Sequence, residues 1–463
     1  MVKKHISEKS QKSKSKNQSL PPQLHMVNLD AAGVDIGSQM HHVAVPFDRA
    51  EQSVREFGAF TSDLHDIVHW LRECEITTVA MESTGVYWIP LFELLEEEGF
   101  EVLLVAPHKL KFVPGRKTDV LDCQWIQTLH TFGLLSSAFR PEQQVCVLRS
   151  YIRQRSMLVR YASNHIQHIQ KALTQMNIKL QHVISDVTGV SGMNIILAIL
   201  DGERDPHVLA SLRDRRCKSP TEKIVASLEG NWRDEHLFSL KQAIECFQFY
   251  QSKIAECDRI IEQQLQSFED QMDGQSVSSP PKKRGKDKNQ PDFNVHEMLV
   301  RMTGVDLTQI DGIEVYSALL IVSEIGTDMS QWRNAKHFAS WLGLCPGSKI
   351  SGGRRISSQT RKCVNRVANI LRLSANTLYN SKSALGGYLR RMKARLGAPK
   401  AITATAHKLA RLIYSMLKFG TDYVDKGQEQ YEKEYQSRRL ANAKRNAKSM
   451  GYKLVPIDAN VDS

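Results

Sequence analysis

The stretch Gly33-Val34-Asp35-Ile36-Gly37-Ser38 places a carboxylate in an apolar run, directly before a glycine turn. Residues 32–36 predict a short strand, and the apolar run 42–46 after the turn predicts a second strand that pairs with it as a hairpin. Taking a charge out of water is unfavourable unless a cation or hydrogen-bond donors compensate it. Asp35 is therefore a candidate functional residue at the end of a core strand.

Two further acidic motifs follow along the chain, Val79-Ala80-Met81-Glu82-Ser83-Thr84-Gly85 and Lys117-Thr118-Asp119-Val120-Leu121-Asp122. Glu82 stands at the end of a predicted strand, before a turn of small residues. With Thr118 as the N-cap of a helix, Asp119 and Asp122 lie three residues apart on one helix face. Strands that alternate with helices in this part of the chain predict a mixed α/β sheet.

Four carboxylates from two strand ends and one helix can converge on a pair of divalent cations. Oxygen ligands suit Mg²⁺ or Mn²⁺, and two such ions about 3.5–4 Å apart stabilise the attacking and leaving oxygens of phosphoryl transfer. Each acid also has a structural interpretation. Asp119 and Asp122 would favour the dipole at a helix N-terminus, and Glu82 would cap a helix. Taken as an ordered set, the four acids favour a metal site.

Positive charge is concentrated in one segment of the chain. The chain has 463 residues, 62 of them Lys or Arg and 50 Asp or Glu, for a net charge of +12. Residues 331–420 hold 18 Lys or Arg and no acidic residue. Subtracting these 18 from the 62 leaves 44 basic residues against 50 acidic ones elsewhere. Charge of one sign at this density indicates a polyanionic partner, and nucleic acid fits better than a membrane surface because the segment lacks a hydrophobic anchor.

The length exceeds what one hydrophobic core supports, so several units are expected. Leu240, Phe247, Ile254, Ile261 and Phe268 recur at every seventh position, which is typical of a coiled coil. An ordinary two-helix hairpin within one chain gives the same pattern. We predict six segments: a disordered basic tail (1–28), an α/β domain (29–142), a helical coiled-coil region (143–272), a flexible linker (273–295), a mainly α-helical domain (296–426) and a C-terminal tail (427–463).

A serine motif lies inside the basic segment, in Gly347-Ser348-Lys349-Ile350-Ser351-Gly352-Gly353-Arg354-Arg355. A serine in a glycine-flanked turn exposes its hydroxyl and allows a ligand to approach closely. The two arginines could clamp a phosphate. From these residues alone, Ser351 is a phosphate contact or a nucleophile that must be activated from elsewhere in the fold. Ser348 is its competitor in the same turn.

Together, GVDIGS, MESTG and KTDVLD closely resemble the RuvC-like domain of DEDD transposases of the insertion-sequence one-hundred-and-ten family. The serine block is similar to the transposase domain of the same family. The resemblance implies an α/β RuvC/ribonuclease H-like domain, a helical coiled-coil region and a mainly α-helical transposase domain. It puts the metal-binding acids at Asp35, Glu82, Asp119 and Asp122, and the nucleophile at Ser351.

The resemblance also implies a site-specific DNA recombinase of an insertion sequence. Its partners would be donor DNA, target DNA and a guide (bridge) RNA, and its intermediate a 5′-phosphoserine. Dimers would assemble into a tetramer with composite sites. Nucleic-acid contacts are expected from basic residues in and after the serine block: Arg354, Arg355, Arg361, Lys362, Arg366, Arg390, Arg391, Lys393 and Arg395.

Three rival functions are weighed against this one. A RuvC-like resolvase would use water in place of Ser351, and a covalent protein–DNA adduct distinguishes the two. An actin-like ATPase or sugar kinase begins with a similar strand and turn, but it needs a second phosphate-loop strand later in the chain. A non-catalytic nucleic-acid-binding protein would not need the complete tetrad. Scattered cysteines and the lack of a long apolar run predict a cytosolic protein, away from membranes. The family resemblance implies the cytoplasm of a prokaryote.

Overall fold

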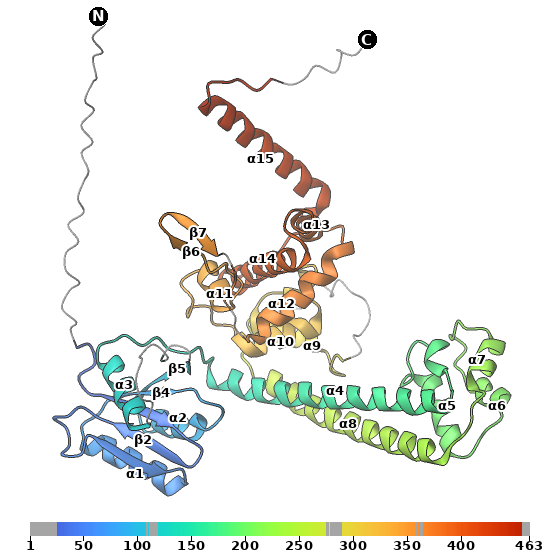
Figure 1. Cartoon of the computed structure of the whole chain (residues 1–463), viewed down its shortest axis with the longest axis horizontal. Helices are drawn as coiled ribbons and strands as arrows, with labels where there is room; N and C mark the ends of the chain where they lie inside the picture. Colours follow the sequence, from blue (N-terminus) through green and yellow to red (C-terminus); the bar gives the residue numbers. More distant parts are fainter. Residues whose placement is uncertain are drawn as a thin grey trace, which may run out of the picture. The chain divides into compact units, whose positions relative to one another are not determined.

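The computed structural model describes residues 26–107, 110, 119–274, 277, 289–357, 359–361 and 364–455. The chain forms two compact units, residues 1–140 and 141–463 (Figure 1). Much of the sequence predicted as tails and linker lies outside the described residues, namely 1–25, 275–276, 278–288 and 456–463. Lys362 and the side chains of Asp119 and Arg355 lie outside them as well.

The first unit is built on a five-stranded sheet in the order β3-β2-β1-β4-β5. β1 pairs antiparallel with β2 and parallel with β4, and β4 pairs parallel with β5. This confirms a mixed sheet and the predicted hairpin after residue 36. The strands are β1 (Ala31–Ile36), β2 (Met40–Ala44), β3 (Val54–Gly58), β4 (Thr78–Glu82) and β5 (Glu101–Val105).

Helices cover both faces of this sheet (Figure 1). On one face, α1 (Thr61–Glu73) and α2 (Trp88–Glu97) form the main core with alternate strand residues such as Val34 and Met81. On the other face lies α3 (Asp119–Thr131), whose Ile126 packs with Ala80 and Val105. Because side chains alternate across a strand, each strand contributes to both layers.

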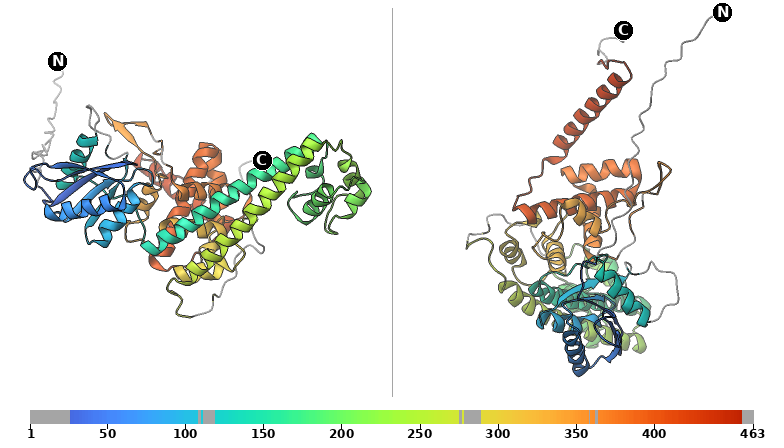
Figure 2. Two further views of the ribbon diagram at one scale, coloured as in Figure 1. Left: turned by 90° about the horizontal axis from the view of Figure 1, so that it is seen from below. Right: turned by 90° about the vertical axis from the view of Figure 1, so that its left-hand side faces the viewer.

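In the second unit, α4 (Gln143–Gln175) and α8 (Asp234–Gln266) pack side by side along their length (Figure 2). Leu240, Phe247, Ile254 and Ile261 are buried, and Phe268 follows the end of α8. The pair is a hairpin within one chain, which is the second of the two arrangements that the heptad pattern allows. Between the two long helices the chain forms shorter ones: η2 (Leu180–His182), α5 (Val190–Leu200), α6 (Pro206–Ser211) and α7 (Thr221–Leu228).

The rest of the second unit is a helical bundle with one exposed β-hairpin. Its central helix is α14, which contacts α11, α12 and α13 and buries Leu409 and Ile413. The elements are α9 (Val295–Thr303), η3 (Leu307–Gln309), α10 (Val315–Ile325), α11 (Ala335–Trp341), β6 (Lys349–Ser351), β7 (Arg354–Ser357), α12 (Arg366–Thr377), η4 (Leu378–Asn380), α13 (Ala384–Leu396), α14 (Ala398–Phe419) and α15 (Gly427–Ser449).

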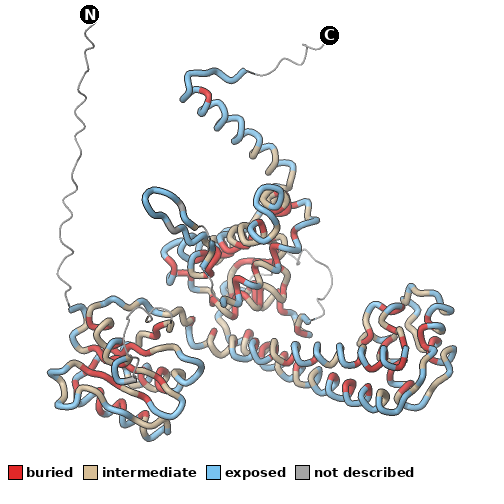
Figure 3. Tube along the Cα trace, viewed as in Figure 1, coloured by how far each residue is buried: buried red, intermediate tan, exposed pale blue. Residues whose placement is uncertain are grey.

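Helix α15 lies where the sequence pattern predicts a tail. It is rich in Glu, Gln, Lys, Arg and Ala, which favour helix, but it has no apolar stripe to reveal it. Most of it is exposed (Figure 3), and its first turns pack on α13. Across the described helices, none is long and apolar enough to cross a membrane.

Candidate active site

Two of the predicted acids lie at the carboxyl ends of neighbouring parallel strands. β1 and β4 pair through Val34 and Met81, so Asp35 and Glu82 are the next residues on each strand. Neighbouring strands lie about 4.8 Å apart, and residues in register point to the same face of a sheet. Both acids are half-buried, and Thr84 Oγ1 donates to Glu82 Oε1 at 3.1 Å.

The alternation of side chains shows which face carries the two acids. Val34 and Met81 belong to the core formed with α1 and α2, whereas Ala80 packs with Ile126 of α3. Asp35 and Glu82 therefore face α3, the helix that carries the other two acids.

Helix α3 approaches β1 so closely that only glycine fits between them. A Cβ atom on Gly33 would lie 2.2 Å from the Gln127 amide nitrogen and 2.4 Å from the Cys123 carbonyl oxygen. Gln127 Nε2 also donates to the Ala31 carbonyl at 3.3 Å. Because Gly33 and Asp35 share a face two residues apart, this contact fixes the first turns of α3 beside Asp35.

Two of the predicted acids influence the pKa of the Cys123 thiol. Burial, and then the carboxylates of Asp35 and Asp122, raise the pKa of Cys123 to about 12. Its Sγ donates to the Val120 carbonyl at 3.1 Å. An acid of β1 and an acid of α3 thus act on the same buried thiol.

The structure brings part of the predicted tetrad together. Asp35 and Glu82 share one face, and Asp122 is half-buried in the first turns of α3. Asp119 is the first residue of α3. Among the described side chains, which do not include that of Asp119, no three His, Cys, Asp or Glu residues are close enough to hold a metal ion.

His42 is a further residue at this edge that the sequence analysis did not single out. It lies opposite Asp35 in the β1–β2 pair and opposite Glu56 in the β2–β3 pair. Directly opposed residues project from the same face of a sheet, and His42 Nε2 lies 3.8 Å from Glu56 Oε2. The pairing of distant strands places it there, and no local motif marks it.

The predicted nucleophile lies on the exposed hairpin of β6 and β7. Ser351 and Arg354 are directly opposed, joined by Gly352 and Gly353. Both glycines have positive φ, 55° and 72°, as a two-residue type I′ turn requires. Ser351, Ser348 and Arg354 are all exposed. Gly352 and Gly353, which can adopt positive φ without strain, therefore form the turn beside Ser351.

The two arms of this hairpin are joined to each other at its base. Pro346 and Thr360 form an isolated bridge, and the Gly347 amide donates to the Gln359 carbonyl at 2.8 Å. The adjoining helix α11 packs in an aromatic cluster of Trp332, Phe338, Trp341 and Tyr414. An exposed tip on a rigid base suits a residue that must reach into a large substrate.

Several predicted nucleic-acid contacts take part in contacts within the protein. Arg361 Nη2 donates to the Trp341 carbonyl at 3.2 Å, and Arg366 Nε lies 3.8 Å from Glu324 Oε1. Arg390 Nη1 donates to the carbonyls of Tyr379 (2.7 Å) and Ser381 (2.8 Å).

Two of the remaining predicted contacts face aromatic rings. Arg391 lies over tyrosine rings of α15, and Lys393 Nζ lies 4.0 Å from the Tyr379 ring centroid. Arg395 is exposed in the last turn of α13.

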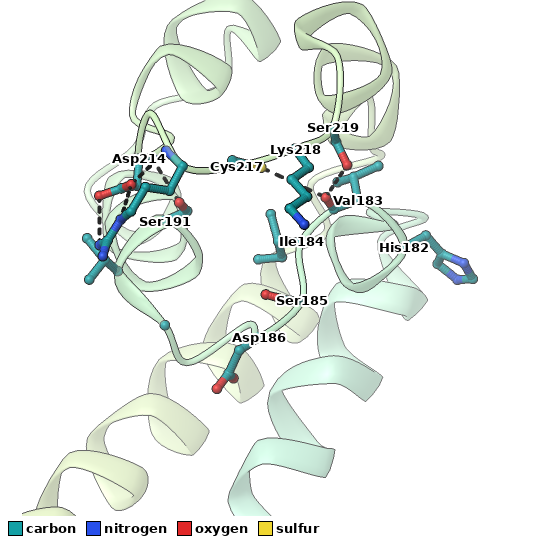
Figure 4. Close-up of a pocket in the computed structure, with 13 residues that line it drawn as sticks. His182, Val183, Ile184, Ser185, Asp186, Ser191, Asp214, Cys217, Lys218 and Ser219 are labelled. Carbon is teal, nitrogen blue, oxygen red and sulfur yellow. Dashed lines mark hydrogen bonds and ion pairs between the residues drawn. The ribbon is translucent and has the colours of Figure 1, made fainter. Parts of the chain in front are cut away.

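A cavity among the short helices between α4 and α8 is a separate feature (Figure 4). Many of its polar groups bond to one another or to nearby backbone. Ser219 Oγ donates to the Val183 carbonyl at 2.5 Å, the Asp214 amide donates to Ser191 Oγ at 2.8 Å, and Arg216 pairs with Asp214. These contacts within the segment between α4 and α8 account for the shape of the cavity.

Two protein-family models match this chain, one over the segment that holds the acids and one over the segment that holds the serine. Residues 32–178 match a family model of DEDD transposases of the IS110 type, described as "Transposase". Residues 306–386 match the model described as "Transposase IS116/IS110/IS902 family". The chain belongs to the IS110 family of transposases. A "Probable family 20 transposase" of Pseudomonas aeruginosa is 23% identical over 409 residues, which cover 86% of this chain and 99% of that relative.

The two matched segments of this IS110-family transposase hold the two candidate sites. The first contains Asp35, Glu82, Asp119 and Asp122, and the second contains Ser351. Membership of the family makes the chain a DNA-processing enzyme. Most of α13 and the whole of α14 and α15 follow the second matched segment.

Proposed function

We propose that this transposase is a site-specific DNA recombinase with an acidic metal site and a serine nucleophile. The observation that carries the proposal is the register of β1 and β4, which gives Asp35 and Glu82 one face beneath α3. The close contact at Gly33 supports the inclusion of Asp122 and Asp119, because it fixes the start of α3 at the same edge.

Asp35, Glu82, Asp119 and Asp122 would hold Mg²⁺ or Mn²⁺ through carboxylate oxygens, which are the ligands these ions prefer. When bound, the ions would neutralise charge that develops on the oxygens of the scissile phosphate. The carboxylates orient the ions, and the buried core behind β1 and β4 keeps the carboxylates in place. Asp35, Glu82 and Asp122 are half-buried, so part of each of these side chains is accessible to substrate.

Ser351 would supply the attacking oxygen. The bond from Ser351 Oγ to phosphorus forms while the bond from phosphorus to the 3′ oxygen breaks. The hydroxyl proton leaves to a base, and the 3′ oxygen takes up a proton. The product is a 5′-phosphoserine, which keeps the bond energy for rejoining. The exposed tip and the opposed Arg354 support this role, because a guanidinium can bind the phosphate oxygens.

A guide RNA and a tetramer belong to the same proposal. The acid-free segment 331–420 supports a large nucleic-acid partner, and the family resemblance extends the partners to donor DNA, target DNA and a bridge RNA. Assembly of dimers into a tetramer would combine acids and serine from different protomers.

The test is a search for a covalent protein–DNA adduct. The full chain is incubated with Mg²⁺, the structured RNA encoded beside its gene, and end-labelled DNA of the element's ends. We expect an adduct that survives denaturant, and we expect Ser351→Ala to lose both adduct and cleavage while it still binds DNA. Ser348→Ala is the matched control and should keep activity. Cleavage by Ser351→Ala with free DNA ends would show that water attacks, and an adduct at Ser348 would correct the residue.

A further inference from the structure

Helices α13, α14 and α15 enclose an open cavity of about 940 Å³ that neither proposed site uses. We call it the cation–tyrosine cavity. Its lining includes four tyrosines, one of them Tyr423 of the segment before α15. The other tyrosines and several basic side chains come from the three helices: Tyr388 and Arg391 of α13, Lys408 of α14, and Tyr431, Tyr435, Arg438 and Arg439 of α15. The cavity is large enough for a nucleotide-sized group.

Arg391 contacts two of the lining tyrosines. Its guanidinium carbon is 3.5 Å from the ring centroid of Tyr435 and 4.6 Å from that of Tyr431. Its Nη1 atom is buried and has no hydrogen-bond partner among the described residues. Cation–π contacts replace part of the lost hydration, but they supply neither a counter-charge nor an acceptor for that N–H. A buried donor without an acceptor is unfavourable.

Lys408 adds a second partly desolvated cation. Its Nζ lies 4.5 Å from the Tyr388 ring centroid and 5.2 Å from that of Tyr431. Burial, and then the charges of Arg438, Arg411 and Arg391, lower the pKa of Lys408 from its usual 10.5. Of the basic side chains in the lining, Arg391, Lys408, Arg438 and Arg439 place four positive charges around one opening.

The carboxylates nearby cancel only part of this charge. Glu434 lines the cavity, but it pairs with Lys426 at 3.1 Å and accepts from Gln430. Asp422 also lines it and is exposed. Within the described part of the chain, no carboxylate oxygen lies within 4.0 Å of the charged groups of Arg391, Lys408, Arg438 or Arg439.

We propose that the cation–tyrosine cavity binds a phosphate group of a nucleic-acid strand. An anion with several acceptor oxygens would give Arg391 Nη1 a partner and relieve the repulsion among the four cations. The second half of α15 favours a strand over a free anion. From residue 436 to 449 it carries Arg438, Arg439, Lys444, Arg445 and Lys448 and no acidic residue, so a phosphate backbone that leaves the cavity meets further positive charge. The proposal extends the nucleic-acid role proposed above, but it uses none of the acids and not Ser351.

The experiment measures how the affinity for RNA depends on salt. A labelled single-stranded RNA of arbitrary sequence is titrated with the full chain by fluorescence anisotropy over a range of KCl concentrations. In a plot of the logarithm of the affinity against the logarithm of the salt concentration, each lost phosphate contact makes the slope less steep by about 0.7 for a single strand. We expect that loss in Lys408→Met and in Arg438→Gln, and a slope equal to wild type in Lys433→Gln. Lys433 is exposed on the same helix and does not line the cavity.

Arg438 is exposed and lies outside the tyrosine stack, so its variant tests the site even if Lys408→Met fails to fold. Wild-type slopes in folded Lys408→Met and Arg438→Gln would overturn the proposal, as would an equal fall in Lys433→Gln. Inorganic pyrophosphate serves as a second probe. If it raises the melting temperature of wild type but not of Lys408→Met, while the RNA slopes are unchanged, the cavity binds free anions and the assignment to a strand is wrong. Ser351→Ala should keep the full slope, which separates a failure of this site from a failure of the serine mechanism.

Discussion

Gly33 of β1 lies against the backbone of Gln127 of α3, so closely that a Cβ atom at residue 33 would stand 2.2 Å from the Gln127 amide nitrogen. The atoms in the way are backbone atoms of a helix, which cannot rotate aside as a side chain can. A strand residue thereby determines where the helix that carries Asp119 and Asp122 can lie. The geometry of the acidic edge depends on a residue with no functional group.

This contact predicts that Gly33→Ala destabilises the first unit and impairs recombination. Overpacking usually costs about 1–3 kcal/mol, and a clash with helix backbone should fall at the upper end or above. Displacement of α3 would also move Asp122 away from Asp35. Urea unfolding followed by circular dichroism, together with a recombination assay, measures both effects.

The matched control for this variant is Gly189→Ala. Gly189 has φ of −77°, and an added Cβ there would lie 3.3 Å from its nearest neighbour. We expect a loss below about 1 kcal/mol, as for other glycines at helix N-caps. A Gly33→Ala protein as stable as Gly189→Ala would show that α3 can shift without cost.

Removal of single carboxylates should abolish recombination without loss of fold. We expect Asp35→Asn, Glu82→Gln and Asp122→Asn each to lower the recombination rate more than about 100-fold, because even outer-shell residues of metal sites contribute up to that factor. Loss of one charge from an acidic cluster relieves repulsion, so the melting temperature without metal should stay equal or rise.

Glu101→Gln is the control for the carboxylate series. Glu101 is an exposed acid at the opposite, amino-terminal end of β5. Its variant should recombine DNA as wild type does. Full activity of Asp35→Asn in Mg²⁺ would refute the metal site.

The buried ion pair of Arg155 and Asp258 should couple strongly in a double-mutant cycle. Arg155 is 2% exposed; it bonds to Asp258 of α8 and donates to the Asn289 carbonyl at 2.8 Å. Either Arg155→Met or Asp258→Leu alone leaves a buried charge unpaired and should cost about 3–5 kcal/mol. The double variant should cost clearly less than the sum of the two.

An exposed ion pair on α8, the helix of Asp258, gives the free-energy change expected for a pair that is not buried. Lys253 and Glu256 pair at 2.9 Å with side chains 41% and 49% exposed. Lys253→Met should change the free energy of unfolding by no more than about 1 kcal/mol. Additive losses from Arg155 and Asp258 would mean that the two side chains do not interact in solution.

Asp306 should make stability depend on pH in the acidic range. Burial alone would raise the pKa of Asp306, but His296, whose Nε2 lies 3.2 Å from Asp306 Oδ2, and hydrogen bonds from Thr308 and Gln309 outweigh it and hold the pKa below 3.8. The unfolded chain therefore binds this proton at a higher pH than the folded one. The stabilisation is complete above about pH 4 and disappears as the pH falls through the folded pKa.

We expect Asp306→Asn to lower the free energy of unfolding near neutral pH by about 1–3 kcal/mol, with the curves of the two proteins converging below about pH 4. Urea unfolding at a series of pH values tests this. Gln309→Leu removes one donor, at 2.6 Å from Asp306 Oδ2, and should give a smaller loss. Parallel curves for wild type and Asp306→Asn through the acidic range would contradict the role of the carboxylate.

The sequence predicts the features that local pattern encodes. An apolar run that ends in an acid and a glycine turn predicts β1 and the position of Asp35, and the SGG motif predicts the turn beside Ser351. It does not reveal contacts between distant segments. The place of His42 depends on strand pairing, and Arg391 lies between tyrosines about 40 residues away. Helix α15 was missed because a mostly exposed helix has no apolar stripe to mark it.

The packed pair of α4 and α8 forms a long arm, and the short helices α5 to α7 lie at its far end. Arg155 fixes α4 to α8 and to the Asn289 carbonyl, and 20 further residues separate Arg155 from Gln175 at the helix end. At 1.5 Å per residue this arm is about 30 Å long. A tilt of the packed α4–α8 pair by about 10° at Arg155 would carry the short helices α5 to α7 through about 5 Å, by the same helix geometry. A small change in angle at the base of this pair would thus become, at its far end, a movement comparable with the rise of a full helical turn.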